Sequence, residues 1–236
     1  MRRSPPRPPT IGGVDVASKP FRDLTLGGFV DRLASAEPVP GGGSASAVAA
    51  SLGAALVAMV AALSEDRPRY AEHAATHRAA GTEGRALATR FLHLADRDAD
   101  AYAGFAMALK LPKETTDEKT ARSAALRSAA RIAAEVPLTC VEACYDLVAA
   151  AERLAGRSNA NASSDLAVAT LLGEAAARGA AANVLVNLPS VADEEFASAM
   201  AARVERLLAD IASLGAATRA VVNSGEARPP IPATDA

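Results

Sequence analysis

Asp98 is the residue whose type and position most clearly suggest acid–base chemistry, because it interrupts a row of apolar residues. The row recurs at spacings of three and four, as on one face of a helix, and consists of Leu87, Phe91, Leu94, Asp98, Ala101 or Tyr102, Phe105 and Leu109. Burial raises the pKa of a carboxyl group, which makes it a useful acid or base near neutral pH. A buried aspartate can equally pair with an arginine or cap a neighbouring helix, and the row leaves both readings open. Asp96 and Asp100 fall on the opposite side of this helix and are expected to face solvent.

A glycine-rich segment, Val39-Pro40-Gly41-Gly42-Gly43-Ser44, precedes a long stretch without any charged residue. Three glycines allow the backbone to turn tightly and to approach a ligand closely. A helix that begins there presents free N–H groups and the positive end of its dipole to an anion. The alternative is a structural turn in which Ser44 caps the helix, and the glycines alone do not decide between the two.

Asp165 and a set of asparagines form a second polar group, which comprises Asn159, Asn161, Asn183 and Asn187. Asp165 follows two serines at a predicted helix start, where it either complements the helix dipole or contacts a ligand. Asn183 lies on the same face of that helix but about 27 Å further along it. The two residues therefore cannot reach one small reacting centre from one subunit, although a long ligand or a subunit interface could use both.

Two further pairs with helical spacing carry weaker signals. His73 and His77 have the spacing of metal ligands, but Glu72 precedes the pair and no third ligand is evident, so no metal site is predicted. Cys140 and Cys144 are expected to be small buried thiols on a helix and not a disulfide.

The elements that must position these residues are predicted to be helices. The chain is rich in alanine and contains 3% aromatic residues, so its intrinsic preference is helical. We expect an all-α, up-and-down bundle of about six helices, some of them long and partly kinked. Prolines, glycines and capping residues place these helices at about 25–35, 44–63, 68–109, 116–154 with a kink at Pro137, 163–188 ending before Pro189, and 193–222. Thr116 and Ser163 or Ser164 are the expected N-caps.

Length and charge restrict the class of protein. The 236 residues are half hydrophobic and carry a net charge of −2, which favours one large domain and argues against a nucleic-acid binder. Residues 1–20 are expected to form a disordered extension without a secretory signal, residues 21–223 the helical domain, and residues 224–236 a flexible tail.

The uncharged stretch from Pro38 to Ser64 is long enough for a membrane span, but its alanines, glycines and serines favour a central helix buried in protein. A cytoplasmic location fits these features.

Six motifs follow one another in a characteristic order: Val39-Pro-Gly-Gly-Gly-Ser44, Asp96-Arg-Asp98-Ala-Asp100-Ala-Tyr102, Leu111-Pro-Lys113 with Thr116 to Lys119 and Arg122, Val136-Pro-Leu138, Ser163-Ser-Asp165, and Asn183-Val-Leu-Val-Asn187-Leu. Their order and spacing, over about residues 24–214, resemble the cyclodeaminase/cyclohydrolase family of folate enzymes. This family includes the cyclodeaminase half of formiminotransferase-cyclodeaminase and stand-alone methenyltetrahydrofolate cyclohydrolases. The resemblance implies an all-helical bundle that assembles as dimers, and it places the catalytic aspartate at Asp98.

The resemblance also implies chemistry at the one-carbon bridge between N5 and N10 of tetrahydrofolate. A proton-shuttling carboxylate such as Asp98 would serve this chemistry, with no cofactor or metal beyond the folate substrate. We expect the backbone of Gly41, Gly42, Gly43 and Ser44 to hold a polar end of the folate. Asp165 is expected to pair with the pterin edge, Lys113 to meet the glutamate tail or remain a solvated loop lysine, and Asn183 and Asn187 to contact the substrate.

Three functions remain open at this point. The chain has no predicted formiminotransferase domain, which favours a 5,10-methenyltetrahydrofolate cyclohydrolase that gives 10-formyltetrahydrofolate. A formimidoyltetrahydrofolate cyclodeaminase that releases ammonia is the alternative, and a non-catalytic bundle that binds folate or a protein is the third possibility. A homodimer is expected because one subunit cannot easily cover the uncharged helix, and a two-fold arrangement would bring Asp165 of one subunit towards Asn183 of the other.

Overall fold

The computed structural model describes residues 19–232, and within this range the chain is helical throughout and contains no strand. The predicted disordered extension lies almost wholly outside the described residues, as does the end of the predicted tail. The elements in chain order are η1 (Phe21–Asp23), α1 (Leu26–Leu33), α2 (Gly42–Ala62), η2 (Pro68–His73), α3 (Ala74–Leu109), α4 (Thr116–Leu154), η3 (Ala160–Ala162), α5 (Ser163–Val191) and α6 (Glu194–Ser224), where η denotes a short 3₁₀ helix. The prediction of an all-α bundle of about six helices is confirmed.

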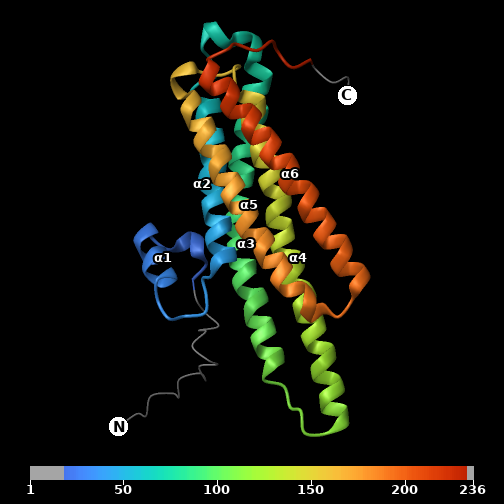
Figure 1. Cartoon of the computed structure of the whole chain (residues 1–236). Coiled ribbons are helices and arrows are strands. Elements are labelled where there is room, and N and C mark those ends of the chain that lie inside the picture. Colours follow the sequence, from blue (N-terminus) through green and yellow to red (C-terminus); the bar gives the residue numbers. More distant parts are fainter. Residues whose placement is uncertain (1–18, 233–236) are drawn as a thin grey trace, which may run out of the picture.

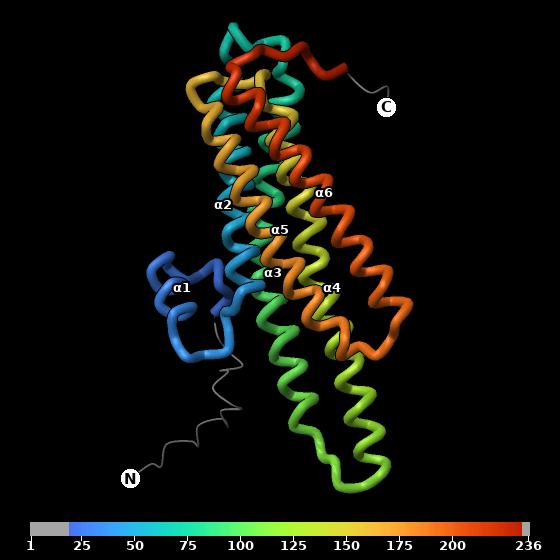
Figure 2. Tube along the Cα trace, viewed as in Figure 1, coloured from blue at the N-terminus to red at the C-terminus, as the bar shows by residue number. Residues whose placement is uncertain are grey.

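The five long helices run up and down beside one another, while α1 lies to one side of the bundle (Figure 1). The central helix α2 packs against α3 and α5, and α4 packs against α3, α5 and α6. Figure 2 shows that α3 and α4 extend beyond the ends of the other helices before a loop joins them. This extension leaves the last turns of α3 without a neighbour on one side.

Small residues on α2 let the helices approach closely. At Gly84 of α3, an added Cβ would lie 2.8 Å from the Ala54 carbonyl oxygen and 2.9 Å from the Ala58 backbone nitrogen, so the two helices meet backbone to backbone. Among the helices of residues 19–232, α2 alone is long and apolar enough to cross a membrane, and half of its apolar window is buried inside the protein. Its position between α3 and α5 matches the predicted central helix.

The structure corrects three of the predicted helix starts. The N-cap of α2 is Gly41, and Ser44 lies inside the first turn with its hydroxyl directed to α3 instead of the α2 backbone. The cap of α4 is Thr115 instead of Thr116: its hydroxyl accepts a hydrogen bond from the Glu118 N–H, and the Glu118 carboxylate accepts one from the Thr115 N–H, which completes a capping box. No side chain caps α5, whose N-cap is Ala162.

The predicted end of α5 at Leu188 is also wrong, since the helix passes through Pro189 to Val191. A proline inside a helix removes the hydrogen bond to the carbonyl four residues earlier, which here belongs to Leu185. Leu185 is exposed, so water can satisfy that carbonyl. The helix ends instead where Ala192 adopts a left-handed conformation with φ 55°.

The segment after α6 is attached to the bundle as far as Pro229. The Arg228 N–H donates to the carbonyl of Gly156 (2.9 Å), and the Arg228 guanidinium donates to the Glu152 carboxylate (2.6 Å). The Arg157 Nε donates to the Pro229 carbonyl (2.7 Å). The predicted flexible tail, residues 224–236, is therefore held to the bundle as far as Pro229, and flexibility stays a prediction for the residues that follow.

Candidate functional site

Asp98 lies in the middle of α3 with its carboxylate against the first turn of α2. The Ser44 hydroxyl is within hydrogen-bonding distance of two acceptors, Asp98 Oδ2 at 2.9 Å and the Ala95 carbonyl oxygen at 3.1 Å. Ser44 is completely buried. Because a hydroxyl carries one proton, Ser44 can donate fully to only one of these acceptors at a time.

Gly43 allows this approach of α3 to α2. A Cβ added at Gly43 would overlap the Asp98 carboxylate, at 2.6 Å from its carboxyl carbon. None of Gly41, Gly42 and Gly43 has a positive φ, so conformational freedom is not the reason for glycine here. Room for the aspartate is the reason at Gly43. The anion that the α2 N-terminus attracts is thus the protein's own Asp98 carboxylate.

Burial raises the pKa of Asp98 above its ordinary value, while hydrogen bonds from the Ser44 hydroxyl and backbone N–H oppose the rise. No ion pair reaches Asp98 among the described residues. Pairing with arginine is therefore not seen within these residues, whereas the hydrogen bonds from Ser44 leave both the acid–base role and the capping of α2 by Asp98 open.

A cavity of about 290 Å³ opens beside Asp98. It is formed by the loop before α2 and by α2, α3, α4 and α5, and it is lined by Pro38, Val39, Gly41, Gly42, Gly43, Asp98, Ala101, Tyr102, Phe105, Ala133, Asn183, Val186 and Asn187. Five of the predicted site residues besides Asp98 are thus brought together in this Asp98 cavity, namely Gly41, Gly42, Gly43, Asn183 and Asn187. Its groups are one carboxylate, two amides, backbone polar atoms and two aromatic rings.

Tyr102 and Phe105 form the aromatic part of the cavity wall. The predicted apolar row is buried from Leu87 to Ala101, but Tyr102 and Leu109 are exposed because α3 continues past its neighbours. The expectation that the whole row faces the core is therefore wrong for its last turns. These rings instead offer flat surfaces to a ligand beside Asp98.

The Asn187 side chain donates a hydrogen bond to a backbone carbonyl of α4 that has lost its helical partner because of a proline. Pro137 has no N–H to donate to the Ala133 carbonyl, four residues earlier in α4. The Asn187 side-chain nitrogen donates to this carbonyl at 3.0 Å and to the Asn183 carbonyl at 2.7 Å. The side-chain nitrogen of Asn183 donates to the Gly179 carbonyl at 2.9 Å. Both N–H groups of the Asn187 amide are thus used, whereas the Asn183 amide keeps one. The two side-chain oxygens and this one N–H are left for a ligand.

Two predicted site residues lie away from the Asp98 cavity. Lys113 is exposed in the loop between α3 and α4, and Asp165 lies in the first turn of α5, at the opposite end of that helix from Asn187. The expected roles of Asp165 and Lys113 stay predictions. Asp100 is exposed as expected, but Asp96 is partly buried and its Oδ1 accepts a hydrogen bond from the Phe21 N–H at 2.7 Å, which fastens η1 to α3.

His77 and Asn159 have structural roles. His77 Nε2 hydrogen-bonds the Arg157 carbonyl at 2.8 Å, and the His73 and His77 rings are 6.2 Å apart. Within residues 19–232 no three His, Cys, Asp or Glu side chains gather as a metal site would need. Asn159 is buried and holds the turn before α5 through the Ser64 hydroxyl. Cys140 and Cys144 are buried free thiols, as predicted.

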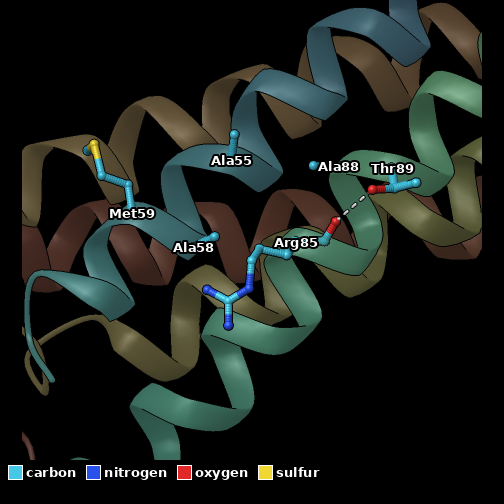
Figure 3. Close-up of a pocket in the computed structure, with 6 residues that line it drawn as sticks. All are labelled: Ala55, Ala58, Met59, Arg85, Ala88 and Thr89. Carbon is cyan, nitrogen blue, oxygen red and sulfur yellow. Dashed lines mark hydrogen bonds between the residues drawn. The ribbon is translucent and has the colours of Figure 1, made fainter. Parts of the chain in front are cut away.

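Another cavity, of about 540 Å³, lies in the groove between α2 and α3 (Figure 3). Its wall consists of Ala55, Ala58, Met59, Arg85, Ala88 and Thr89, and the Thr89 hydroxyl already donates to the Arg85 carbonyl. A wall of alanine, methionine and one arginine supplies no acid or base, so this groove is not the catalytic site.

Sequence reasoning missed Ala133 and the aromatic wall. The signal for Ala133 is Pro137, because a proline within a helix always frees the carbonyl four residues before it. The aromatic wall had no comparable signal in the sequence, because Tyr102 and Phe105 fit the pattern of core-facing residues. They line the cavity because α3 continues past its neighbours at this point.

Comparisons with known proteins agree with this geometry. A family model described as formiminotransferase-cyclodeaminase matches residues 25–206. A methenyltetrahydrofolate cyclohydrolase of Methylorubrum extorquens is 37% identical over 80% of this chain and 91% of its own length. The formimidoyltransferase-cyclodeaminase of Mus musculus is 36% identical over 87% of this chain, which spans 38% of that longer protein. A solved structure of formiminotetrahydrofolate cyclodeaminase from Thermotoga maritima superposes with a TM-score of 0.78 and 27% identity, over 86% of this chain and 98% of that one. The chain therefore belongs to the formiminotransferase-cyclodeaminase family.

Proposed function

We propose that this protein acts on the one-carbon bridge between N5 and N10 of tetrahydrofolate, as a 5,10-methenyltetrahydrofolate cyclohydrolase that gives 10-formyltetrahydrofolate. The observation that carries the proposal is Asp98, a partly buried carboxylate that has no cationic partner within residues 19–232 and faces a cavity with two aromatic rings. The methenyl substrate is a flat cation, so it supplies the missing positive charge and can stack on the rings of Tyr102 and Phe105.

The cavity volume of about 290 Å³ suits the reacting rings better than a whole folate. The pterin and the bridge would lie inside it, and the glutamate end would remain outside. The side-chain oxygens of Asn183 and Asn187 can accept hydrogen bonds from the amino groups of the pterin.

Hydrolysis then needs one group that takes and returns a proton. As water attacks the methenyl carbon, ionised Asp98 removes a proton from it and a neutral tetrahedral carbon forms. Protonated Asp98 next gives this proton to N5 while the bond between the carbon and N5 breaks. The hydroxyl proton leaves to solvent as the formyl C=O forms on N10. The overall change consumes one water and releases one proton, and Asp98 returns to its ionised state.

The cyclodeaminase reaction is the second candidate, and the likeness to the Thermotoga maritima cyclodeaminase favours it. There N10 attacks an N5-formimino carbon and ammonia leaves, through a tetrahedral carbon of similar charge. The Methylorubrum extorquens cyclohydrolase is the more similar in sequence, which is why hydrolysis is placed first.

The decisive experiment offers the purified protein each substrate separately. Loss of the methenyl chromophore indicates the cyclohydrolase, and gain of this chromophore with release of ammonia from the formimino substrate indicates the cyclodeaminase. Inactivity on both would overturn the proposal and favour a non-catalytic folate or protein binder.

We also propose that the protein is a cytoplasmic homodimer that needs no cofactor beyond the folate and binds neither nucleic acid nor a membrane. Support for the dimer comes from α2 and α5, which pack against each other and expose apolar side chains that include Leu52, Met59, Val168 and Leu171. The alanine-lined groove of Figure 3 continues this face of α2. A second copy covering the face would remove these side chains from water. A two-fold arrangement would also let Asp165 of one copy approach the Asp98 cavity of the other.

A further inference from the structure

A second polar cavity lies at the far end of the bundle from Asp98. It has a volume of about 330 Å³, and Arg67, Arg69, Tyr70, Asn159, Ala160 and Asn161 line it together with Pro68. These residues define the end pocket. It sits beyond the last turn of α2, whereas the Asp98 cavity sits at the first turn. The length of α2 therefore separates the two cavities by about 30 Å.

Both arginines of the end pocket keep an uncompensated charge. No carboxylate in the described part of the chain lies within 4.0 Å of Arg67 or Arg69, whereas eight other arginines there pair with a carboxylate. Neither guanidinium donates a hydrogen bond to a described residue, although Arg122 and Arg157 each donate to carbonyls. The end pocket thus holds two sets of unused donors.

Tyr70 fixes the position of one of these arginines. The Tyr70 hydroxyl accepts a hydrogen bond from the Ala160 N–H at 3.1 Å, which ties η2 to the turn before α5. The Arg69 guanidinium lies over the Tyr70 ring, with its central carbon 5.7 Å from the ring centre. An arginine stacked in this way keeps its N–H edge free and loses less side-chain entropy when it binds a carboxylate.

The backbone brings Arg67 and the asparagines to the same place. Asp66 adopts a left-handed conformation with φ 55°, which turns the chain between α2 and η2 just before Arg67. Across the pocket, Asn159 is fixed through its N–H to the Ser64 hydroxyl at 2.8 Å, and its side-chain oxygen accepts from the Asn161 N–H at 3.2 Å. The side-chain amide of Asn161 makes no hydrogen bond within the described residues and is available as a donor.

A smaller cavity of about 90 Å³ continues from the end pocket. The two cavities share Arg69, Tyr70 and Ala160, and the smaller one reaches Ser158 and Ser163. The separated donors of Arg67, Arg69 and Asn161 fit a ligand that carries more than one acceptor group. Guanidinium groups match carboxylates through paired parallel hydrogen bonds.

We propose that the end pocket is a second binding site, for an anionic ligand whose carboxylates pair with Arg67 and Arg69. The glutamate end of a folate supplies such carboxylates, and this choice of source rests on the proposed function. Inorganic phosphate presents oxygens of similar charge and is the other source.

Direct binding tests the site without any turnover. Calorimetric titrations of the full chain use a γ-linked tetraglutamate peptide and, separately, inorganic phosphate. We expect the peptide to bind, and the Arg67→Ala/Arg69→Ala double variant to bind it about ten- to a hundredfold more weakly, since each pairing is a charge-assisted hydrogen bond. Arg69→Lys, which keeps the charge but loses the paired geometry, should weaken binding less than Arg69→Ala.

Two controls separate the end pocket from general charge and from the Asp98 cavity. Arg78→Ala removes an exposed arginine from the same end of α3 and should leave binding unchanged. Asp98→Asn should also leave it unchanged, so a failure of the proposed enzymatic function does not affect this test. If phosphate binds and the peptide does not, and the double variant no longer binds phosphate, the end pocket is an anion site whose ligand is phosphate. Absence of binding by both probes, or equal binding by the double variant, overturns the proposal.

Discussion

Gly43 of α2 and Asp98 of α3 are in direct contact, so closely that a Cβ on Gly43 would stand 2.6 Å from the Asp98 carboxyl carbon. This contact places the carboxylate at the N-terminus of α2 and at the wall of the Asp98 cavity. The glycine segment therefore positions the acid–base group.

Gly43→Ala should displace Asp98 and lower kcat at least about tenfold, because the added methyl group and the carboxylate cannot occupy the same space. Gly104→Ala is the matched control, since no atom lies within 4 Å of a Cβ there and Gly104 does not line the Asp98 cavity. Steady-state kinetics with circular dichroism to verify folding make the comparison. Equal activity of the two variants would show that the contact does not position the carboxylate.

Ser44→Ala should move the rising limb of the pH–rate profile to higher pH. The Ser44 hydrogen bond opposes the rise in the pKa of Asp98 that burial causes, so its removal raises this pKa further. Ionised Asp98 is the base, and activity therefore increases as pH rises through its pKa. The control is Ser51→Ala, which removes a buried hydroxyl from the same helix that bonds only to the Val48 carbonyl. If the pH–rate profiles of Ser44→Ala and Ser51→Ala coincide, the Ser44 hydrogen bond does not set the pKa of Asp98.

Asn187→Ala should lower the free energy of unfolding by about 1–3 kcal/mol, because it leaves the Ala133 carbonyl without its donor. In the background of Pro137→Ala the loss should be smaller, since residue 137 then has an N–H that can reach this carbonyl. Urea denaturation of the four proteins in this double-mutant cycle measures the difference. An identical loss in both backgrounds would mean that Asn187 stabilises the fold by another route.

The proposed dimer predicts about twice the subunit mass in light scattering at low micromolar concentration. Leu52→Glu places a charge on the exposed apolar face of α2 and should give monomers. Ile132→Glu alters an equally exposed apolar residue on α4, outside that face, and should leave the mass unchanged. An active wild-type monomer would contradict both the interface and the approach of Asp165 to the cavity of another copy.

The sequence predicted the helices well because prolines, glycines and capping residues act over a few residues. The helix expected over about 25–35, for example, is α1 with Thr25 as its N-cap, and α4 ends at Leu154 as expected. Pro189 misled the prediction because only the fold shows that the carbonyl it releases, on Leu185, faces solvent.

The Asp98 cavity was predicted in part. Asp98 was identifiable because an acid in an apolar row is unusual, and Asn183 and Asn187 because their motif resembles that of the folate-enzyme family. The contact of Gly43 with Asp98, and the hydrogen bond from Ser44, depend on how α2 and α3 pack, which no local pattern in the sequence specifies. The end pocket likewise joins residues of η2 to the turn before α5, from distant parts of the chain.

The most direct test of the account is the rate at which purified Asp98→Asn consumes 5,10-methenyltetrahydrofolate, compared with the wild type and with Asp100→Asn at an exposed site on the same helix. Asparagine keeps the size of the side chain but cannot take a proton, so the rate should fall about 10²–10⁴-fold, while Asp100→Asn stays near wild type. The variant should remain folded. Burial raises the pKa of Asp98 in the folded state, so any stability that this carboxyl contributes is present at low pH and is lost as pH rises through that pKa. At pH 7 the asparagine variant should accordingly melt no lower than the wild type. A folded Asp98→Asn protein that retains activity within a few-fold of wild type would contradict the central claim that Asp98 transfers the proton.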